Sequence, residues 1–326
     1  MEITVINVGY GDAILIETDD GCKVLLDGGS NLATEFGDDP YRIRPAEYLA
    51  KTKTEHLDAV VISHIHEDHV CGLEAVLQQV KVDRLYVPYP PEVFLSGCEL
   101  TPEKGSARSV FLYTEALNAY RRILMRAGEE GIPLTVLTAG DVIDLGHSSK
   151  MKVLLPQRSR VDNYMKLVEK AYGAVKEPAV ASRFLAMLDA CSNHAGMLLR
   201  FELADTVFLS AADTCPCDWD DAPSFLLKNV NVLKMPHHGQ LDSVSELYMA
   251  EMPLQYVITT AASDRRYNSA NKQVYRRLTA MHPDNPPRFL FSDEREYPPF
   301  FSQPDGFQAI QLRMNSGELA PVFIKI

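Results

Sequence analysis

The sequence lacks any uninterrupted apolar run of the roughly 18 or more residues that a membrane-spanning helix requires. Its first five residues, MEITV, carry neither the basic segment nor the apolar core of a secretory signal. Glycine, serine and proline nowhere gather into a linker, and no short repeat is present. These absences favour a single globular, cytoplasmic domain over residues 1–326, without a membrane span.

Cysteine is sparse and scattered, with six residues in a chain of 326. A chain of this length with 46% hydrophobic residues can bury a sizeable core without disulfide bonds, so reduced thiols are expected. The Cys215-Pro216-Cys217 segment has no second cysteine pair at zinc-ribbon spacing. A structural role is favoured for it, and a metal-binding or redox role stays open.

Positive charge is in deficit, because 32 Lys and Arg residues face 44 Asp and Glu residues and the formal net charge is −12. This balance disfavours loose electrostatic binding to nucleic acid or to anionic membranes. Basic residues nevertheless cluster beside and within residues 157–192, where they form either a nucleic-acid track or a solvated helix face. They are Lys150, Lys152, Arg158, Arg160, Lys166 and Lys170.

Short apolar or alternating segments predict strands along most of the chain. An amphipathic pattern over residues 107–128 predicts a long helix. Residues 157–192 are helix-like with few strand signals, and we expect them to be an insertion. From residue 230 onwards strands and helices alternate, so an α/β fold is expected. The principal expected strands are 3–8, 13–17, 23–26, 58–63, 197–203, 206–210, 230–234, 256–259 and 288–291.

The sharpest chemical feature is the run His-Ile-His-Glu-Asp-His at residues 64–69. It follows the apolar strand expected at 58–63 and precedes a helical pattern at 72–80. Imidazole nitrogen and carboxylate oxygen both bind zinc, at roughly 2.0–2.2 Å, and a loop between strand and helix lets neighbouring side chains converge. The run therefore predicts a metal site rather than a solvated cluster of polar side chains.

This run resembles the H-x-H-x-D-H signature of the metallo-β-lactamase superfamily. Residues 7–16 (NVGYGDAILI) and 26–29 (LDGG) look like the opening of its ComEC-type branch. The PHHG segment at 236–239 is similar to an element of ComEC-type hydrolases and of teichoic acid phosphorylcholine esterases. The resemblance implies a four-layer αββα sandwich, with residues 157–192 as a helical insertion near the active site.

The resemblance also implies a centre of two metal ions. The implied ligands are His64, His66 and His194 for the first ion, Asp68, His69 and His238 for the second, and Asp213 for both. Asp27 would support a ligating histidine from behind, because such a histidine usually donates its other N–H to a carboxylate or carbonyl. His237 would donate a hydrogen bond to the developing oxyanion, and Asp68 is grouped with it among the catalytic residues.

Zinc is the expected metal, because a di-iron branch of this fold usually has Glu where this chain has His66. Manganese and iron remain alternatives. Two zinc ions would lower the pKa of a bridging water from about 15.7 towards about 7, so that hydroxide is the nucleophile. We expect hydrolysis of a small or lipid-derived phosphodiester, such as a phosphocholine ester.

Three alternatives stay open because one fold hosts many chemistries. They are a ComEC-type nuclease acting on DNA or RNA, another hydrolase of this fold, and a non-catalytic regulator that binds a ligand.

Overall fold

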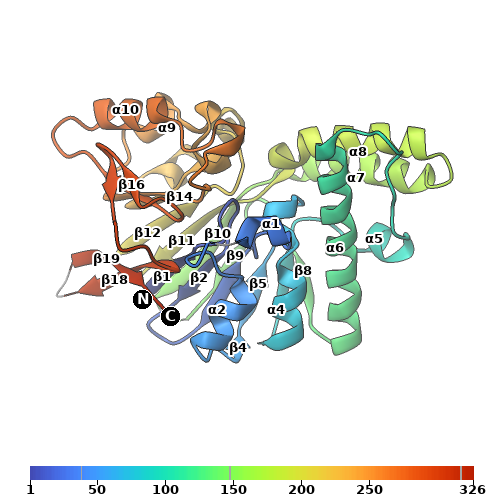
Figure 1. The fold of residues 1–326 in the computed structure, drawn as a ribbon, viewed down its shortest axis with the longest axis horizontal. Helices are drawn as coiled ribbons and strands as arrows, with labels where there is room; N and C mark the ends of the chain where they lie inside the picture. The colour runs from blue at the N-terminus through green and yellow to red at the C-terminus, as the bar shows by residue number, and fades with distance from the viewer. Residues whose placement is uncertain (38, 147, 316–317) are drawn as a thin grey trace.

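The computed structural model describes residues 1–37, 39–146, 148–315 and 318–326. Two β-sheets lie face to face, and helices cover their outer faces (Figure 1). This arrangement is the four-layer α/β sandwich that was expected. Over the described residues, no helix combines the length and apolar character that crossing a membrane requires.

The first sheet begins antiparallel and becomes parallel after β3. Its order over the described residues is β19 (Glu318–Ile324), β18 (Ala309–Asn315), β1 (Glu2–Ile6), β2 (Ile14–Glu17), β3 (Lys23–Leu26), β5 (Ala59–Val61), β7 (Leu85–Val87) and β8 (Leu134–Val136). A short parallel pair, β4 (His56–Leu57) and β6 (Lys81–Val82), lies beside it.

The second sheet is parallel on the side that carries the later strands and antiparallel elsewhere. Its order over the described residues is β15 (Arg288–Phe291), β14 (Tyr256–Thr259), β13 (Val232–Lys234), β12 (Thr206–Ser210), β11 (Leu198–Leu203), β10 (Ser149–Leu155) and β9 (Val142–Asp144). A small hairpin pairs β16 (Glu296–Tyr297) with β17 (Phe301–Ser302).

Helices α2, α4 and α6 cover the first sheet, and α9 and α10 cover the second (Figure 1). The helices are α1 (Ala33–Phe36), α2 (Pro45–Lys51), α3 (Glu67–Val70), α4 (Leu73–Gln79), α5 (Glu92–Ser96), α6 (Arg108–Glu130), α7 (Arg158–Gly173), α8 (Pro178–Ser192), α9 (Glu246–Met249) and α10 (Lys272–Met281). The segment 157–192 is thus the pair α7 and α8. That this pair is an insertion stays a prediction.

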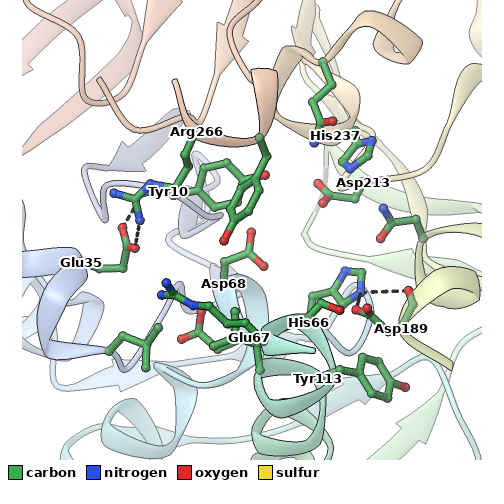
Figure 2. Close-up of a pocket in the computed structure, with 17 residues that line it drawn as sticks. Tyr10, Glu35, His66, Glu67, Asp68, Tyr113, Asp189, Asp213, His237 and Arg266 are labelled. Carbon is green, nitrogen blue, oxygen red and sulfur yellow. Dashed lines mark hydrogen bonds and ion pairs between the residues drawn. The ribbon is translucent and has the colours of Figure 1, made fainter. Parts of the chain in front are cut away.

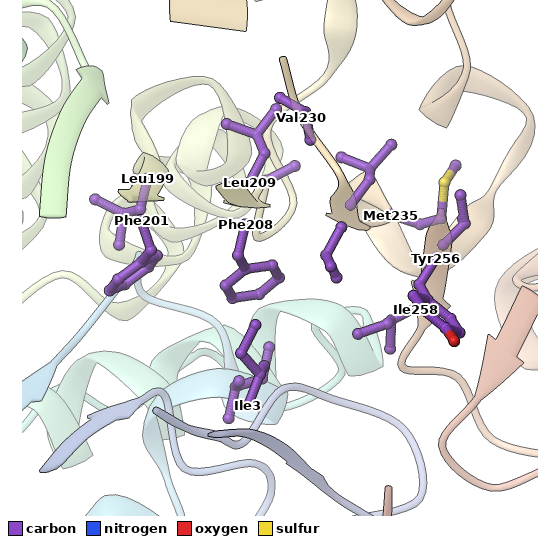
Figure 3. Packing of buried hydrophobic residues seen from close by; sticks show 14 of the residues in the cluster. Ile3, Leu199, Phe201, Phe208, Leu209, Val230, Met235, Tyr256 and Ile258 are labelled. Carbon is purple, nitrogen blue, oxygen red and sulfur yellow. The ribbon is translucent and has the colours of Figure 1, made fainter. Parts of the chain in front are cut away.

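The two-residue period of the strands divides the core into layers. In β2, Ile14 and Ile16 belong to the cluster between the sheets, whereas Leu15 packs with the helices of the outer face. Figure 3 shows the inner layer, in which Phe208 of the second sheet faces Ile3 of the first. Burial of such side chains contributes about 25 cal/mol per Å² of apolar surface. The packing fixes how the strand ends of the two sheets meet.

Glycine lets two loops at these strand ends lie directly against the segment that contains α3. Gly11, between β1 and β2, has a φ of +129°, and a Cβ there would collide with the carbonyl of Asp68. A Cβ on Gly72 would likewise collide with the carbonyl of Gly28. The loop after β1 and the loop after β3 are therefore held against α3, which carries part of the histidine run.

Candidate metal centre

The histidine run lies at the carboxyl end of β5, and α3 begins inside it. His64 and His69 are fully buried, and His66 is partly exposed. The Nε2 atom of His64 lies 3.0 Å from the Nδ1 atom of His66. The first two imidazoles therefore present neighbouring nitrogen atoms to one point.

Asp213 joins this pair to a second group of ligand atoms. It follows β12, at the edge of the second sheet that faces the histidine run. One ligand atom each from His64, His66 and Asp213 lies within 4.8 Å of the others. Asp213 thus belongs to the group of His64 and His66, and its role as a shared ligand stays a prediction.

The second group combines both sheets and consists of Asp68, His69, Asp213 and His238, whose ligand atoms also lie within 4.8 Å of one another. The Nε2 atom of His238 is 3.0 Å from Asp68 Oδ2 and 3.3 Å from Asp213 Oδ1. The Nε2 atom of His69 is 3.4 Å from the same Asp213 oxygen. Three chain segments that are distant in sequence therefore converge.

The chemistry of this convergence fits a divalent metal. Four of its atoms are buried without a hydrogen-bond partner among the described residues: Asp68 Oδ2, His69 Nε2, Asp213 Oδ1 and His238 Nε2. Leaving a buried polar group unsatisfied costs about 1–3 kcal/mol, so four together are unfavourable without a ligand. Imidazole nitrogen and carboxylate oxygen are a donor set that suits zinc and related ions.

Each histidine of the two groups uses one ring nitrogen to contact an oxygen atom on the side away from the other ligand atoms. Such a contact fixes the orientation of the ring. These contacts are His64 Nδ1 with Ser63 Oγ (2.9 Å), His66 Nε2 with the Asp189 carbonyl (3.3 Å), His69 Nδ1 with Asp27 Oδ2 (2.9 Å) and His238 Nδ1 with the Thr260 carbonyl (2.6 Å). Asp27 is fully buried and also accepts a hydrogen bond from the Ser63 hydroxyl at 2.6 Å. It thus lies behind His69, and its role in supporting a metal ligand stays a prediction.

His194 lies outside both groups. It sits in a short turn, η1 (Asn193–Ala195), between α8 and β11, and its side chain is 54% exposed. Its Nδ1 atom lies 2.6 Å from Asp218 Oδ2, which leaves Nε2 as the nitrogen atom for a metal. The role of His194 as third ligand of the first ion stays a prediction.

The adjacent residues His237 and His238 point in different directions because of their backbone. They lie in the turn η4 (Pro236–Gly239), where φ is 46° at His237, 51° at His238 and 71° at Gly239. Left-handed backbone at non-glycine residues costs roughly 1–3 kcal/mol each and clusters at functional sites. His238 enters the buried group, whereas His237 lines the cavity described below (Figure 2).

Burial and neighbouring charges shift the pKa values of these groups. Burial lowers the pKa of His238, but the neighbouring carboxylates of Asp213 and Asp68 outweigh this effect and raise the pKa to about 9. Burial raises the pKa of Asp68, but His69 and His238 bring it down to about 2. Burial and the neighbouring imidazoles hold the pKa of His64 well below its ordinary value. His64 is therefore neutral, as metal ligation requires, while protons on His238 compete with a metal.

A cavity of about 430 Å³ opens over the two groups (Figure 2). One wall comes from the first two turns of α6 and the end of α8, including Tyr113 and Asp189. The opposite wall includes Tyr10 and Arg266, which forms an ion pair with Glu35. Asp68, Asp213, His66 and His237 all reach the cavity, so the converging ligand atoms are accessible from it.

Sequence reasoning missed several residues that contact the predicted ligands or His237. They are Asp12, Asp189, Asp218, Lys234, Asp242 and Thr260. Two of them could have been found from the sequence. Lys234 ends an apolar strand just before the histidine pair, and Asp12 lies in the NVGYGDAILI segment. The other four stand in segments without a pattern of their own.

Two members of the basic cluster beside and within residues 157–192 form ion pairs with carboxylates. Lys152 forms an ion pair with Glu202 at 2.8 Å. Arg160 pairs with Asp218 at 2.8 Å and with Asp221 at 2.6 Å, and it donates a hydrogen bond to the His194 carbonyl. Arg160 therefore holds the segment around His194 rather than presenting a free cation.

Comparison with known proteins finds a matching family model and a curated relative. The model of the metallo-β-lactamase superfamily matches residues 6–149. ComE operon protein 3 of Bacillus subtilis is 22% identical over 290 residues, which cover 85% of this chain and 30% of that protein. This chain thus spans about 30% of the length of the curated relative it matches.

Two solved structures are similar in fold. The metallo-β-lactamase fold protein YhfI from Bacillus subtilis has a TM-score of 0.47 and 11% identity, over 89% of this chain and 96% of that chain. The metallo hydrolase Igni18 from the archaeon Ignicoccus hospitalis has a TM-score of 0.47 and 11% identity, over 97% of this chain and all of the other.

Proposed function

We propose that this chain, a hydrolase with the metallo-β-lactamase fold and a divalent-metal site, is a phosphodiesterase that works with two zinc ions. The observation that carries the proposal is the convergence of two groups of nitrogen and oxygen atoms that share Asp213. A carboxylate common to two groups suits a pair of cations about 3.5–4 Å apart, a spacing found in phosphatases and nucleases.

The ligands in this proposal come from both sheets. His64 and His66 would hold one ion, with His194 as their third partner, and Asp68, His69 and His238 would hold the other, while Asp213 serves both. When bound, such ions lower the pKa of water and offset negative charge that accumulates on the substrate oxygens. Mn²⁺ and iron are alternatives to zinc.

His237 would donate a hydrogen bond to the substrate. Its Nδ1 atom lies 3.0 Å from Asp242 Oδ2, which leaves Nε2 for a substrate oxygen. The left-handed backbone and the contact with Asp242 hold the ring before a substrate arrives. A donor held in advance needs little reorganisation as charge develops, and this is a large term in catalysis.

Tyr10 is a second donor at the same cavity. Its ring lies 4.3 Å from the ring of His238 between centroids. Burial and the nearby carboxylates of Asp68 and Asp213 raise the pKa of its phenol well above the ordinary value. The phenol therefore keeps its proton at neutral pH and can donate it in a hydrogen bond to a phosphoryl oxygen.

The substrate class rests on three supports. The PHHG segment resembles that of teichoic acid phosphorylcholine esterases, and two cations with two hydrogen-bond donors suit displacement at phosphorus. A cavity of about 430 Å³ walled by α6 and α8 suits a small substrate. We therefore favour a small or lipid-derived phosphodiester. A ComEC-type nuclease is the second candidate, supported by the similarity to ComE operon protein 3.

The test is metal analysis combined with two activity assays. Protein purified without chelators should contain close to two divalent ions per chain and hydrolyse bis(p-nitrophenyl) phosphate. Plasmid nicking at equal enzyme concentration then separates the two candidates. Protein that contains no metal and takes up no added zinc would refute the proposal, and strong nicking with weak ester hydrolysis would favour the nuclease.

A further inference from the structure

Lys234 is a fully buried lysine at the carboxyl end of β13. Its strand lies between β12 and β14, with parallel partners on both sides. Lysine is almost never fully buried unless it is paired, because removing an ammonium from water is costly. Its contacts should therefore reveal why a charge stands at this position.

The ammonium of Lys234 contacts the loop that presents Asp213. Its Nζ atom donates a hydrogen bond to the carbonyl of Ala212 at 2.8 Å and lies 3.6 Å from Asp213 Oδ1. Ala212 directly precedes Asp213 and has a φ of 44°. One cation therefore holds both the backbone and the side chain at the position that the two ligand groups share.

Asp12 holds this ammonium from the opposite sheet. It lies in the loop between β1 and β2, is fully buried, and places Oδ2 2.5 Å from Lys234 Nζ. Its Oδ1 atom accepts a hydrogen bond from Thr260 at 2.5 Å, and its backbone N–H donates to the Asp68 carbonyl at 3.1 Å. The Lys234–Asp12 pair thus joins the two sheets directly behind the second ligand group.

We propose that the Lys234–Asp12 pair is a positioning device for the metal centre, in which the ammonium holds the Asp213 carboxylate in the orientation that both ligand groups share. This inference rests on the metal centre of the proposed function. The carboxylates of Asp12, Asp68 and Asp213 repel one another in a medium of low dielectric constant. A fixed ammonium among them keeps Asp213 in place before a metal binds.

A purely structural pair predicts a different outcome. Buried ion pairs can often be replaced by uncharged side chains of similar volume without loss of stability. If the pair only joined the sheets, removing both charges together would leave metal binding unchanged. If it orients Asp213, removing both charges would preserve the fold and still weaken metal binding.

The experiment compares wild-type protein with the double variant Lys234→Met/Asp12→Asn. The single variant Lys234→Met is less informative, because it leaves the Asp12 carboxylate buried without its cation and is expected to destabilise the fold. The control is Lys152→Met, which removes an ion pair of 2.8 Å between β10 and β11, away from the centre, and leaves Glu202 paired with Arg200 at 2.9 Å. The readouts are thermal unfolding of metal-free protein, zinc affinity by chelator competition, and the absorption spectrum of the Co²⁺-loaded protein.

We expect the double variant to unfold near the wild-type temperature when metal-free, to bind zinc about 10–100-fold more weakly, and to show an altered Co²⁺ spectrum. The control should match wild type in affinity and spectrum. A folded double variant with wild-type affinity and spectrum would overturn the inference alone. Wild-type protein that binds no metal would overturn the proposed metal centre and this inference with it.

A second variant keeps the test decisive if the double variant does not fold. Asp12→Asn leaves the ammonium near the Asp213 carboxylate and bonded to the Ala212 carbonyl, and keeps an oxygen atom for the Thr260 hydroxyl, so the fold should persist. It should lose zinc affinity in the same direction and to a smaller extent, because Lys234 is then less firmly held. Unchanged affinity and an unchanged Co²⁺ spectrum in folded Asp12→Asn would also overturn the inference.

Discussion

At the scale of single residues, backbone conformation assigns different surroundings to neighbouring side chains. His237 and His238 both have left-handed backbone, yet only His238 is among the buried ligand atoms. His237 is held by Asp242 at the cavity wall. The resemblance implied different roles for the two histidines, and the structure places them in different surroundings.

Substitution of each histidine by alanine should separate these two roles. His238→Ala should lose at least one metal ion per chain, because a ligand of the second group is removed. His237→Ala should keep both ions and lose about 10²–10³-fold in kcat, the cost of removing one preorganised donor. Metal content and bis(p-nitrophenyl) phosphate kinetics are the measurements, and equal metal loss in both variants would contradict this division.

Metal binding should strengthen as pH rises towards about 9. In the metal-free protein the pKa of His238 is raised to about 9 by Asp213 and Asp68, after the opposing effect of burial, so the ring is protonated below that pH. A metal must displace this proton, and its affinity therefore falls as pH falls. Zinc affinity measured from pH 6 to 9, with proton release by calorimetry in two buffers, tests this, and a flat profile without proton release would contradict it.

At the scale of elements, the histidine run is contacted by a helix that lies outside the two sheets. The hydroxyl of Ser192, at the end of α8, donates a hydrogen bond to the Ile65 carbonyl at 2.9 Å. Asp189 of the same helix contacts His66. The helix-like character of residues 157–192 was visible in the sequence, but its attachment to the histidine run was not, because that attachment joins residues about 125 positions apart.

Truncating a buried side chain of α8 should destabilise the protein. Leu188 is fully buried in the cluster that packs α6, α7 and α8 together, so Leu188→Ala should lower the free energy of unfolding by about 2–5 kcal/mol. The neighbouring Met187 is 51% exposed, and Met187→Ala should change it by no more than about 0.5 kcal/mol. Denaturant unfolding measures both values, and similar effects of the two substitutions would show that α8 is not packed as described.

At the scale of the whole molecule, the proposed ligands come from both sheets, so a bound metal joins the two halves of the sandwich. Asp68 and His69 come after strand β5 of the first sheet. Asp213 and His238 come after strands β12 and β13 of the second sheet. Any ligand that binds the folded state alone stabilises it by mass action. The free energy of unfolding should therefore increase when the metal site is filled.

Removal of metal should lower the thermal stability of the wild-type protein, and added zinc should restore it. At a free concentration 100 times its dissociation constant, zinc contributes about 2.7 kcal/mol per site. Asp213→Ala should show a much smaller response, because both groups lose their shared ligand. Calorimetry with and without chelator is the measurement. A response as large in Asp213→Ala as in wild type would contradict the shared role of Asp213.

The sequence by itself determined the strands and the densest part of the site. Strands 23–26, 206–210, 256–259 and 288–291 have the bounds that were expected, because alternation and apolar runs are local signals. Other elements were misjudged: the strand expected at 58–63 is only β5, and the short helix α2 was missed although a proline opens it. The histidine run was recognisable because its candidate ligands are neighbours in the chain.

Only the tertiary structure decided which distant side chains meet. Asp12 lies in a loop of the first sheet and Lys234 ends a strand of the second, and the two pair because both lie at the same edge of the sandwich. The same packing leaves His194 exposed beside Asp218 rather than inside a ligand group. Such pairings depend on how two sheets pack and where their strands end, which is a property of the folded core and is not encoded in any short segment of sequence.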